Sequence, residues 1–320
     1  MYKAKFKWPG GAYIAVVFNM SWESWPDTLA TAKTSESGQG GPPVDAEYSR
    51  GMRAIYEHAY AETGGLQRLL DVWRRHKIKS SCYADGLTVT LFPELAKAVR
   101  DGGHEFIVQG WDHSPLTRMT VAQQVKSIDD TIDAFQKVLG IRATGFSSPG
   151  GNVTNETFPL LVERGFKYAC GLRNTDLPFI MNVGGKKLVG QTSYWISEFN
   201  THHGWNAVSE VVKRYKDAFD AMYLEGKRGF PMLLPYGTHP FLGTAFRTKP
   251  MEDLIKYIKK KPKVWITTRD EIAQYMLDKY PDYTLDKFYP EAVASDRHYG
   301  LGIGLGGQEA AEKMARFRKK

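Results

Sequence analysis

A group of polar side chains able to carry or move protons follows the predicted strands of this chain, at the point where each strand ends. These residues, in chain order, are Glu23, Asp85, Gln109, His113, Ser147, Ser148, Asp176, Tyr236, Thr238 and His239. Carboxylates and imidazoles serve as general acids and bases, and hydroxyl and amide groups donate hydrogen bonds. Parallel strands of a barrel end on one shared face, so this spacing predicts one catalytic pocket assembled from several strands.

The densest of these clusters lies in residues 103–113. The apolar run 106–108 is too short for a helix and predicts a buried strand. It ends before Gly110, and Gln109, Trp111, Asp112 and His113 crowd the exit. A buried strand does not need such a cluster for stability, whereas a pocket built where strands end does need one.

Strand and helix patterns alternate about seven times over residues 13–280. Strands are predicted at 13–18, 79–84, 106–108, 144–147, 167–171, 231–236 and 264–267, with weaker candidates at 188–190 and 194–196. Helices are predicted around 66–73, 93–100, 121–139, 156–164, 207–224, 251–260 and 270–280. This alternation predicts parallel strands joined by right-handed crossovers. No dinucleotide-binding glycine pattern follows the first strand, which favours an irregular (β/α) barrel over a doubly wound sheet. The predicted domains are the barrel, 1–280, and a short C-terminal extension, 281–320.

The composition is that of a soluble globular protein, with 42% hydrophobic and 24% charged residues among 320. No apolar stretch is long enough to cross a membrane, and no apolar region follows the basic first seven residues as in a signal peptide. The two cysteines, Cys82 and Cys170, fit a reducing cytoplasm. Much of the net charge of +8 lies in residues 256–263 and in the tail, without a nucleic-acid-binding motif. We therefore expect no nucleic-acid partner and no membrane.

Residues 103–113 and 237–241 together resemble the polysaccharide deacetylase (nodulation-deacetylase homology) family. The resemblance extends through residues 8–11, 145–150, 176–179 and 264–272, so it covers roughly residues 8–280. It is strongest for the branch that contains allantoinases, cyclic imidases and related small-molecule amide hydrolases. It implies a barrel with an active site at the strand ends, in agreement with the alternation of strands and helices.

The resemblance also implies a divalent metal held by one Asp and two His, but this chain departs from that pattern. Asn19 stands where the family's catalytic-base Asp is expected, and Ser21 where its metal-binding Asp is expected. Gln109 replaces the first metal-binding His, and only His113 matches. A catalytic zinc site needs three protein ligands and an open position. We therefore expect no cofactor; if zinc were bound, His113 and Glu23 would hold it.

These observations predict a hydrolase that acts on a carbon–nitrogen, non-peptide bond of a small cyclic amide or imide, without the usual metal triad. General acid–base groups supply roughly 10²–10⁴-fold each, which suits a reactive ring amide better than an acetamido sugar. Two alternatives stay open: a metal-dependent N-deacetylase of a saccharide, and a non-catalytic binding protein. We expect a cytoplasmic homo-oligomer whose partner is the small-molecule substrate.

Each candidate residue has a predicted role. The catalytic candidates are Glu23, His113, His239 and Asp176, and the substrate-binding candidates are Gln109, Ser148, Trp22, Trp111 and Asn19. Either Glu23 or His113 is the base toward water, and either Asp112 or Asp176 orients the histidine. The resemblance implies that His239 is the acid that protonates the leaving nitrogen. Gln109 and the turn at residues 147–148 are expected to bind the carbonyl oxygen, and the two tryptophans to line the pocket.

Overall fold

Ten strands form one central sheet in a computed structural model, which describes residues 6–24, 56, 58–172, 175–193, 196–197 and 207–284. The strands are β1 (Ile14–Trp22), β2 (Ser80–Ala84), β3 (Glu105–Val108), β4 (Gly145–Ser147), β5 (Tyr168–Leu172), β6 (Phe179–Val183), β7 (Lys186–Thr192), β8 (Ile196–Ser197), β9 (Met232–Thr238) and β10 (Val264–Thr267). Their order is β6-β7-β5-β4-β3-β2-β1-β9-β8, and β10 pairs with β1. Every pairing is parallel except that of β6 with β7. The predicted α/β, barrel-like fold is confirmed, with more strands than the seven expected.

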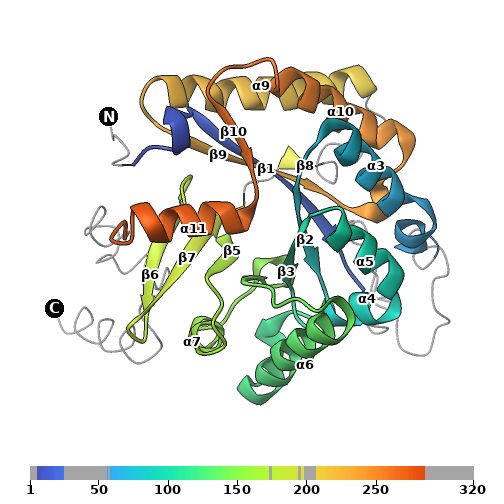
Figure 1. The fold of residues 1–320 in the computed structure, drawn as a ribbon, viewed down its shortest axis with the longest axis vertical. Coiled ribbons are helices and arrows are strands. Elements are labelled where there is room, and N and C mark those ends of the chain that lie inside the picture. Colours follow the sequence, from blue (N-terminus) through green and yellow to red (C-terminus); the bar gives the residue numbers. More distant parts are fainter. Residues whose placement is uncertain are drawn as a thin grey trace.

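Helices surround this sheet, as Figure 1 shows. They are α3 (Leu66–His76), α4 (Gly86–Leu91), α5 (Pro93–Asp101), α6 (Val121–Leu139), α7 (Thr157–Glu163), α9 (Val208–Lys227), α10 (Ala245–Ile258) and α11 (Arg269–Lys279). Helices α9 and α10 pack side by side, α10 also contacts α3, and α6 contacts α4 and α5. Helix α11 packs on β6 and β7. Strand β1 is buried on both faces of the sheet, and its sequence is therefore nearly continuously apolar.

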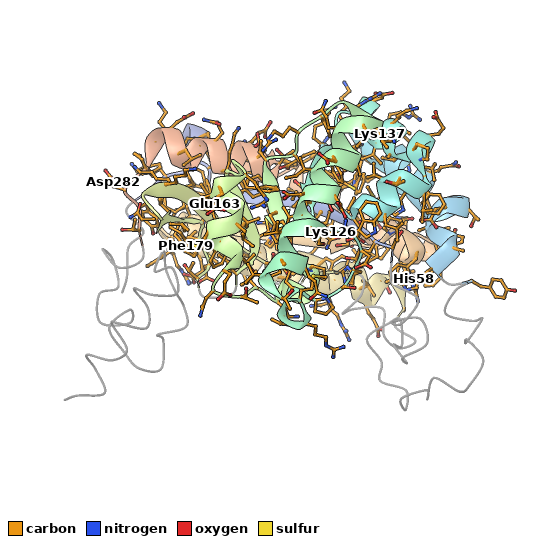
Figure 2. The ribbon with its side chains drawn as sticks, turned by 90° about the horizontal axis from the view of Figure 1, so that it is seen from below. His58, Lys126, Lys137, Glu163, Phe179 and Asp282 are labelled. Carbon is orange, nitrogen blue, oxygen red and sulfur yellow. The ribbon has the colours of Figure 1, made fainter. Side chains whose placement is uncertain are left out.

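Helix α6 confirms the prediction made from its sequence. The Thr120 side chain accepts a hydrogen bond from the Gln123 backbone N–H at 3.3 Å, and Gln123 Oε1 accepts one from the Thr120 backbone N–H at 2.8 Å. This reciprocal cap satisfies two donors that the first turn leaves unpaired. The apolar face, including Ile128, is buried against the sheet, whereas Lys126 and Lys137 lie along the outer side of the helix in Figure 2.

Three segments differ from the prediction. Helix α10 begins at Ala245, six residues before the predicted start, because Pro250 lies inside the helix rather than at its beginning. Helix α4 has no counterpart among the predicted helices, and β6 and β7 form an antiparallel hairpin that overlaps the predicted strands only at residues 188–190. At the predicted extension, Thr284 pairs with Ile180 of β6. Residues 194–195 of the predicted strand and 285–320 of the extension lie outside the described residues.

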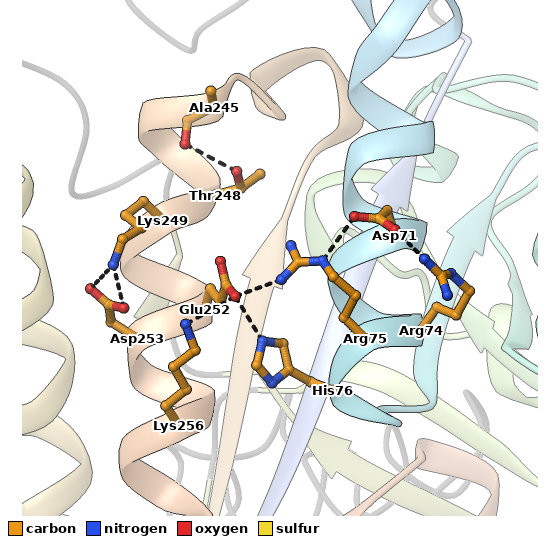
Figure 3. A network of polar contacts seen from close by, with 10 residues as sticks. All are labelled: Asp71, Arg74, Arg75, His76, Ala245, Thr248, Lys249, Glu252, Asp253 and Lys256. Atoms are coloured by element: carbon orange, nitrogen blue, oxygen red, sulfur yellow. Dashed lines mark hydrogen bonds and ion pairs between the residues drawn. The ribbon is translucent and has the colours of Figure 1, made fainter.

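A charged network ties α3 to α10, as Figure 3 shows. Glu252 accepts hydrogen bonds from Arg75 Nη1 at 2.7 Å and lies 2.8 Å from His76 Nε2. Lys256 Nζ lies 3.1 Å from the same oxygen. The His76 hydrogen bond, followed by those of Arg75 and Lys256, lowers the pKa of Glu252 to about 2. The network joins two helices that lie far apart in the sequence.

A second polar network spans the interior of the sheet, one layer below the strand ends. Asn19, Ser81 and Glu105 are partners in the register of β1, β2 and β3, so their side chains share one face. Ser81 Oγ donates to Glu105 Oε2 at 2.6 Å, and the Tyr168 hydroxyl donates to Glu105 Oε1. Burial raises the pKa of Glu105 to about 7, although these hydrogen bonds oppose the shift.

No helix among the described ranges combines the length and the apolar character needed to cross a bilayer.

Candidate active site

The loop after β3 is fastened to its neighbours by backbone hydrogen bonds. The Gly86 N–H donates to the Gly110 carbonyl at 3.0 Å, and the His113 N–H donates to the Ser24 carbonyl at 3.1 Å. Gly110 has a φ of 122°, and a Cβ atom there would lie 3.1 Å from Ser127 Oγ. Glycine therefore suits this exit from the strand, and the loop is held against the segment that follows β1.

Glu23 lies between Gln109 and His113 at the ends of β1 and β3. Gln109 Nε2 donates to Glu23 Oε1 at 3.3 Å, and His113 Nδ1 lies 3.6 Å from Glu23 Oε2, within ion-pair distance. A carboxylate only accepts hydrogen bonds, so the amide nitrogen of Gln109 must face it. The amide oxygen of Gln109 is buried and has no hydrogen-bond partner among the described residues. The structure thus brings together three residues singled out from the sequence.

Asp85 is a fourth member of this cluster, noted at a strand end in the sequence but given no role there. Its Oδ2 atom accepts a hydrogen bond from the Ser24 N–H at 2.9 Å. Oδ1 is buried without a partner in the described part of the chain. Burial, and then the charge of Glu23, raise the pKa of Asp85 well above its usual range. Its position directly after β2 is the signal that placed it among the candidate residues in the sequence.

The serine turn after β4 is buried, and its side chains are partly engaged. Ser148 Oγ donates to the Asn152 carbonyl, while Ser147 Oγ lies 3.9 Å from the Cβ position that Gly171 leaves empty. His239 follows β9, and its ring centroid lies 5.4 Å from that of Phe241. The roles predicted for Ser148 and His239 stay predictions.

The two tryptophans occupy different environments. Trp22 is fully buried, its Nε1 donates to Glu62 at 2.7 Å, and its ring centroid lies 6.2 Å from that of Phe92. These contacts place Trp22 in the packing around β1 and give no support to its predicted place in the pocket lining. Trp111 is half-buried, and its ring lies 2.9 Å from the Cβ position that Gly86 leaves empty.

Neither aspartate predicted to orient the histidine contacts it in the structure. Asp112 Oδ1 accepts the Ser114 N–H at 3.1 Å and so caps its own turn. Asp176 is exposed in the segment before β6, with no recorded contact to a described histidine. The carboxylate that lies beside His113 is Glu23.

The donor set does not fit the metal site that the family resemblance implies. Among the described residues, no group of three His, Cys, Asp or Glu side chains is arranged to hold a metal ion. The cluster contains His113 and the carboxyl groups of Glu23 and Asp85, but these three are not arranged to hold a metal ion. Gln109 presents its amide nitrogen, not its oxygen, to Glu23. Zinc requires a third protein ligand.

Comparisons with known proteins agree with this fold. A family model described as polysaccharide deacetylase matches residues 55–169. A peptidoglycan deacetylase of Helicobacter pylori is 27% identical over 45% of this chain, which spans about half (47%) of that relative's length. A probable polysaccharide deacetylase structure from Pseudomonas aeruginosa aligns with a TM-score of 0.75 and 24% identity, over 86% of this chain and 94% of that one. The structure of Puue allantoinase aligns with a TM-score of 0.77 and 26% identity, over 86% and 93%.

Proposed function

We propose that this chain, a hydrolase that carries a polysaccharide deacetylase domain, cleaves a carbon–nitrogen bond in a small cyclic amide or imide without the family's metal triad. The observation that carries the proposal is the position of Glu23 between Gln109 and His113. A carboxylate next to an imidazole is a base unit that needs no metal. The similarity to Puue allantoinase over most of the chain supports the same class of substrate.

In this proposal the pair formed by Glu23 and His113 acts as the base. Glu23 lies 3.6 Å from Nδ1 and stabilises the positive charge of the imidazole, while Nε2 accepts one proton from water as the water oxygen bonds to the carbonyl carbon. The carbon–nitrogen bond then breaks, and His239 gives a proton to the leaving nitrogen. The product is one ring-opened molecule that carries a new carboxylic acid and a new amine or amide group, and it accounts for all atoms of substrate and water.

The orientation of Gln109 supports a substrate that carries an N–H next to its carbonyl group. Its amide oxygen is a buried acceptor without a partner among the described residues, which costs about 1–3 kcal/mol. A ring N–H of a hydantoin or an imide would satisfy that acceptor. The predicted contact of Gln109 with a carbonyl oxygen is therefore replaced in this proposal by a contact with a ring nitrogen.

A second candidate function is the removal of an acetyl group from an N-acetyl sugar. The match to the polysaccharide deacetylase model and the similarity to a peptidoglycan deacetylase favour it. It requires the bound metal that the donor set of Glu23 and His113 does not complete.

One substrate panel separates the two functions. Purified protein is incubated with hydantoin, allantoin, succinimide and N-acetylglucosamine oligomers, and ring opening and acetate release are measured. The proposal expects ring opening that Glu23→Gln and His239→Ala each slow by about 10²–10⁴, whereas the exposed control Glu94→Gln keeps the full rate. Acetate release with no ring opening would establish the deacetylase instead. Ring opening at the full rate in Glu23→Gln would contradict the assigned base.

A further inference from the structure

Arg269, the first residue of α11, places a buried cation beneath the candidate site. Its side chain is fully buried, and Nη1 donates to the Thr192 carbonyl at 2.9 Å and to Gln191 Oε1 at 3.2 Å. Its Nε atom donates to Asn19 Oδ1 at 3.3 Å. The structure records no ion pair of this guanidinium with a described carboxylate, and Nη2 has no hydrogen-bond partner within the described ranges. Burying a charge that only neutral groups contact costs free energy of folding. Packing alone would therefore not require a charged side chain at position 269.

The contact with Arg269 fixes the orientation of the Asn19 amide. A guanidinium N–H only donates, so the atom of Asn19 that faces Nε must be the oxygen. The Tyr83 hydroxyl donates to the same oxygen at 3.4 Å. With two donors on Oδ1, the amide nitrogen of Asn19 must point away from Arg269 and Tyr83.

Asn19 lies on the same face of β1 as Ser21, because successive strand side chains alternate, and Glu23 follows the end of this strand. Among the described residues, none accepts a hydrogen bond from the Asn19 amide nitrogen, and the side chain keeps 6% exposure. A fixed amide donor with a cation behind it is the arrangement that stabilises negative charge on a substrate oxygen.

We propose that Asn19 donates a hydrogen bond to the carbonyl oxygen of the substrate and that Arg269 is the positioning residue that fixes this donor. The inference rests on the proposed function, in which that oxygen gains negative charge as water adds to the carbonyl carbon. It assigns the amide of Asn19 as a donor in the reaction. It also gives the buried charge of Arg269 a purpose: the low-dielectric interior strengthens its effect on the developing oxyanion.

The first test measures catalysis. Asn19→Asp keeps the shape of the side chain, but its carboxylate pairs with Arg269 and offers no donor. We expect kcat for the ring amide to fall by roughly 10²–10³, the loss that follows removal of one oxyanion donor, while KM changes little. Arg269→Gln should lower kcat through the freed amide, and Arg269→Lys should restore part of it. The control is Asn182→Asp, at an exposed position of β6.

The second test needs no turnover and keeps failure of this inference distinct from failure of the proposed function. The side-chain amide protons of Asn19 are identified in ¹H–¹⁵N spectra by their loss in Asn19→Asp. On titration with hydantoin they should shift, while those of Asn182 stay in place. A shift without turnover of any ring amide would support the donor and remove the proposed reaction. Turnover with unshifted Asn19 protons, or full kcat in Asn19→Asp, would overturn the donor and leave the reaction standing.

Discussion

Gln109 Nε2 lies 3.3 Å from Glu23 Oε1, and this hydrogen bond joins the ends of two strands that are not neighbours in the sheet. It fixes which end of the Gln109 amide faces the carboxylate, and it leaves the amide oxygen of Gln109 as an acceptor. Together with the approach of His113 to the other oxygen of Glu23, it defines a site of acid–base chemistry.

Replacing Gln109 by Glu tests this contact without a change of shape. The new carboxylate faces Glu23 and repels it, so the protonated form of the pair is favoured. We expect a loss of ring-amide turnover at neutral pH and an acid limb of the pH–rate profile that moves to higher pH. The comparison is Gln136→Glu at an exposed position of α6, which should leave the profile unchanged. A profile that stays in place in Gln109→Glu would show that Gln109 does not contact the base.

Glu23 and His113 should behave as one unit in a double-mutant cycle. Glu23→Gln and His113→Ala are each expected to reduce kcat by about 10²–10⁴. Because each removes the function of the pair, the double variant should be no slower than the slower single variant. Effects on log kcat that add fully would mean that the two side chains act at separate steps.

The raised pKa of Glu105 predicts that the free energy of unfolding falls as pH rises. Its folded-state pKa of about 7 lies above the ordinary value of 4.5, so the folded protein holds this proton more tightly than the unfolded chain. Its contribution is complete below pH 4.5 and is lost by about pH 7, a decline of roughly 3 kcal/mol in the free energy of unfolding. Glu105→Gln should remove that decline in urea titrations carried out between pH 4.5 and 8. An equal decline in the variant would assign it to other groups.

The lowered pKa of Glu252 predicts the opposite: its contribution to the free energy of unfolding is lost as pH falls. Its pKa of about 2 lies below 4.5, so its contribution is present above pH 4.5 and disappears as pH falls toward 2. The ion pairs are partly open to solvent, and we expect Glu252→Gln to lower the free energy of unfolding by only about 1 kcal/mol at pH 7. The difference should vanish near pH 2. Glu94→Gln is the matched control, since Glu94 forms an exposed ion pair with Lys97. Equal effects of the two variants at pH 7 would mean that the network of α3 and α10 adds nothing beyond one exposed pair.

The elements with a strong local signal were predictable from the sequence. Thr120 caps α6 where its hydroxyl precedes a helical apolar pattern, and the alternation of strands and helices indicates parallel strands. The proximity of Glu23, Gln109 and His113 could be inferred as well, because parallel strands end at one face.

Other features depend on tertiary contacts that no local pattern reveals. Pro250 marks a helix start by local rules, yet tertiary packing keeps it inside α10. Arg269 looks like a solvated residue in the first turn of a helix, and only the meeting of β1, β7 and β10 shows that it is buried against Asn19. The sequence predicts Trp22 beside the pocket, whereas the structure buries its side chain. The position of a residue at a strand end does not indicate which face of the sheet its side chain takes.

One paired measurement tests whether Glu23 and His113 hydrolyse a ring amide without a metal triad. Bound metal and hydantoin turnover are determined in the same preparation before and after exhaustive treatment with a chelator. We expect turnover to persist unchanged in protein that holds far less than one equivalent of metal. Turnover that disappears with the chelator and returns when zinc is added would contradict it.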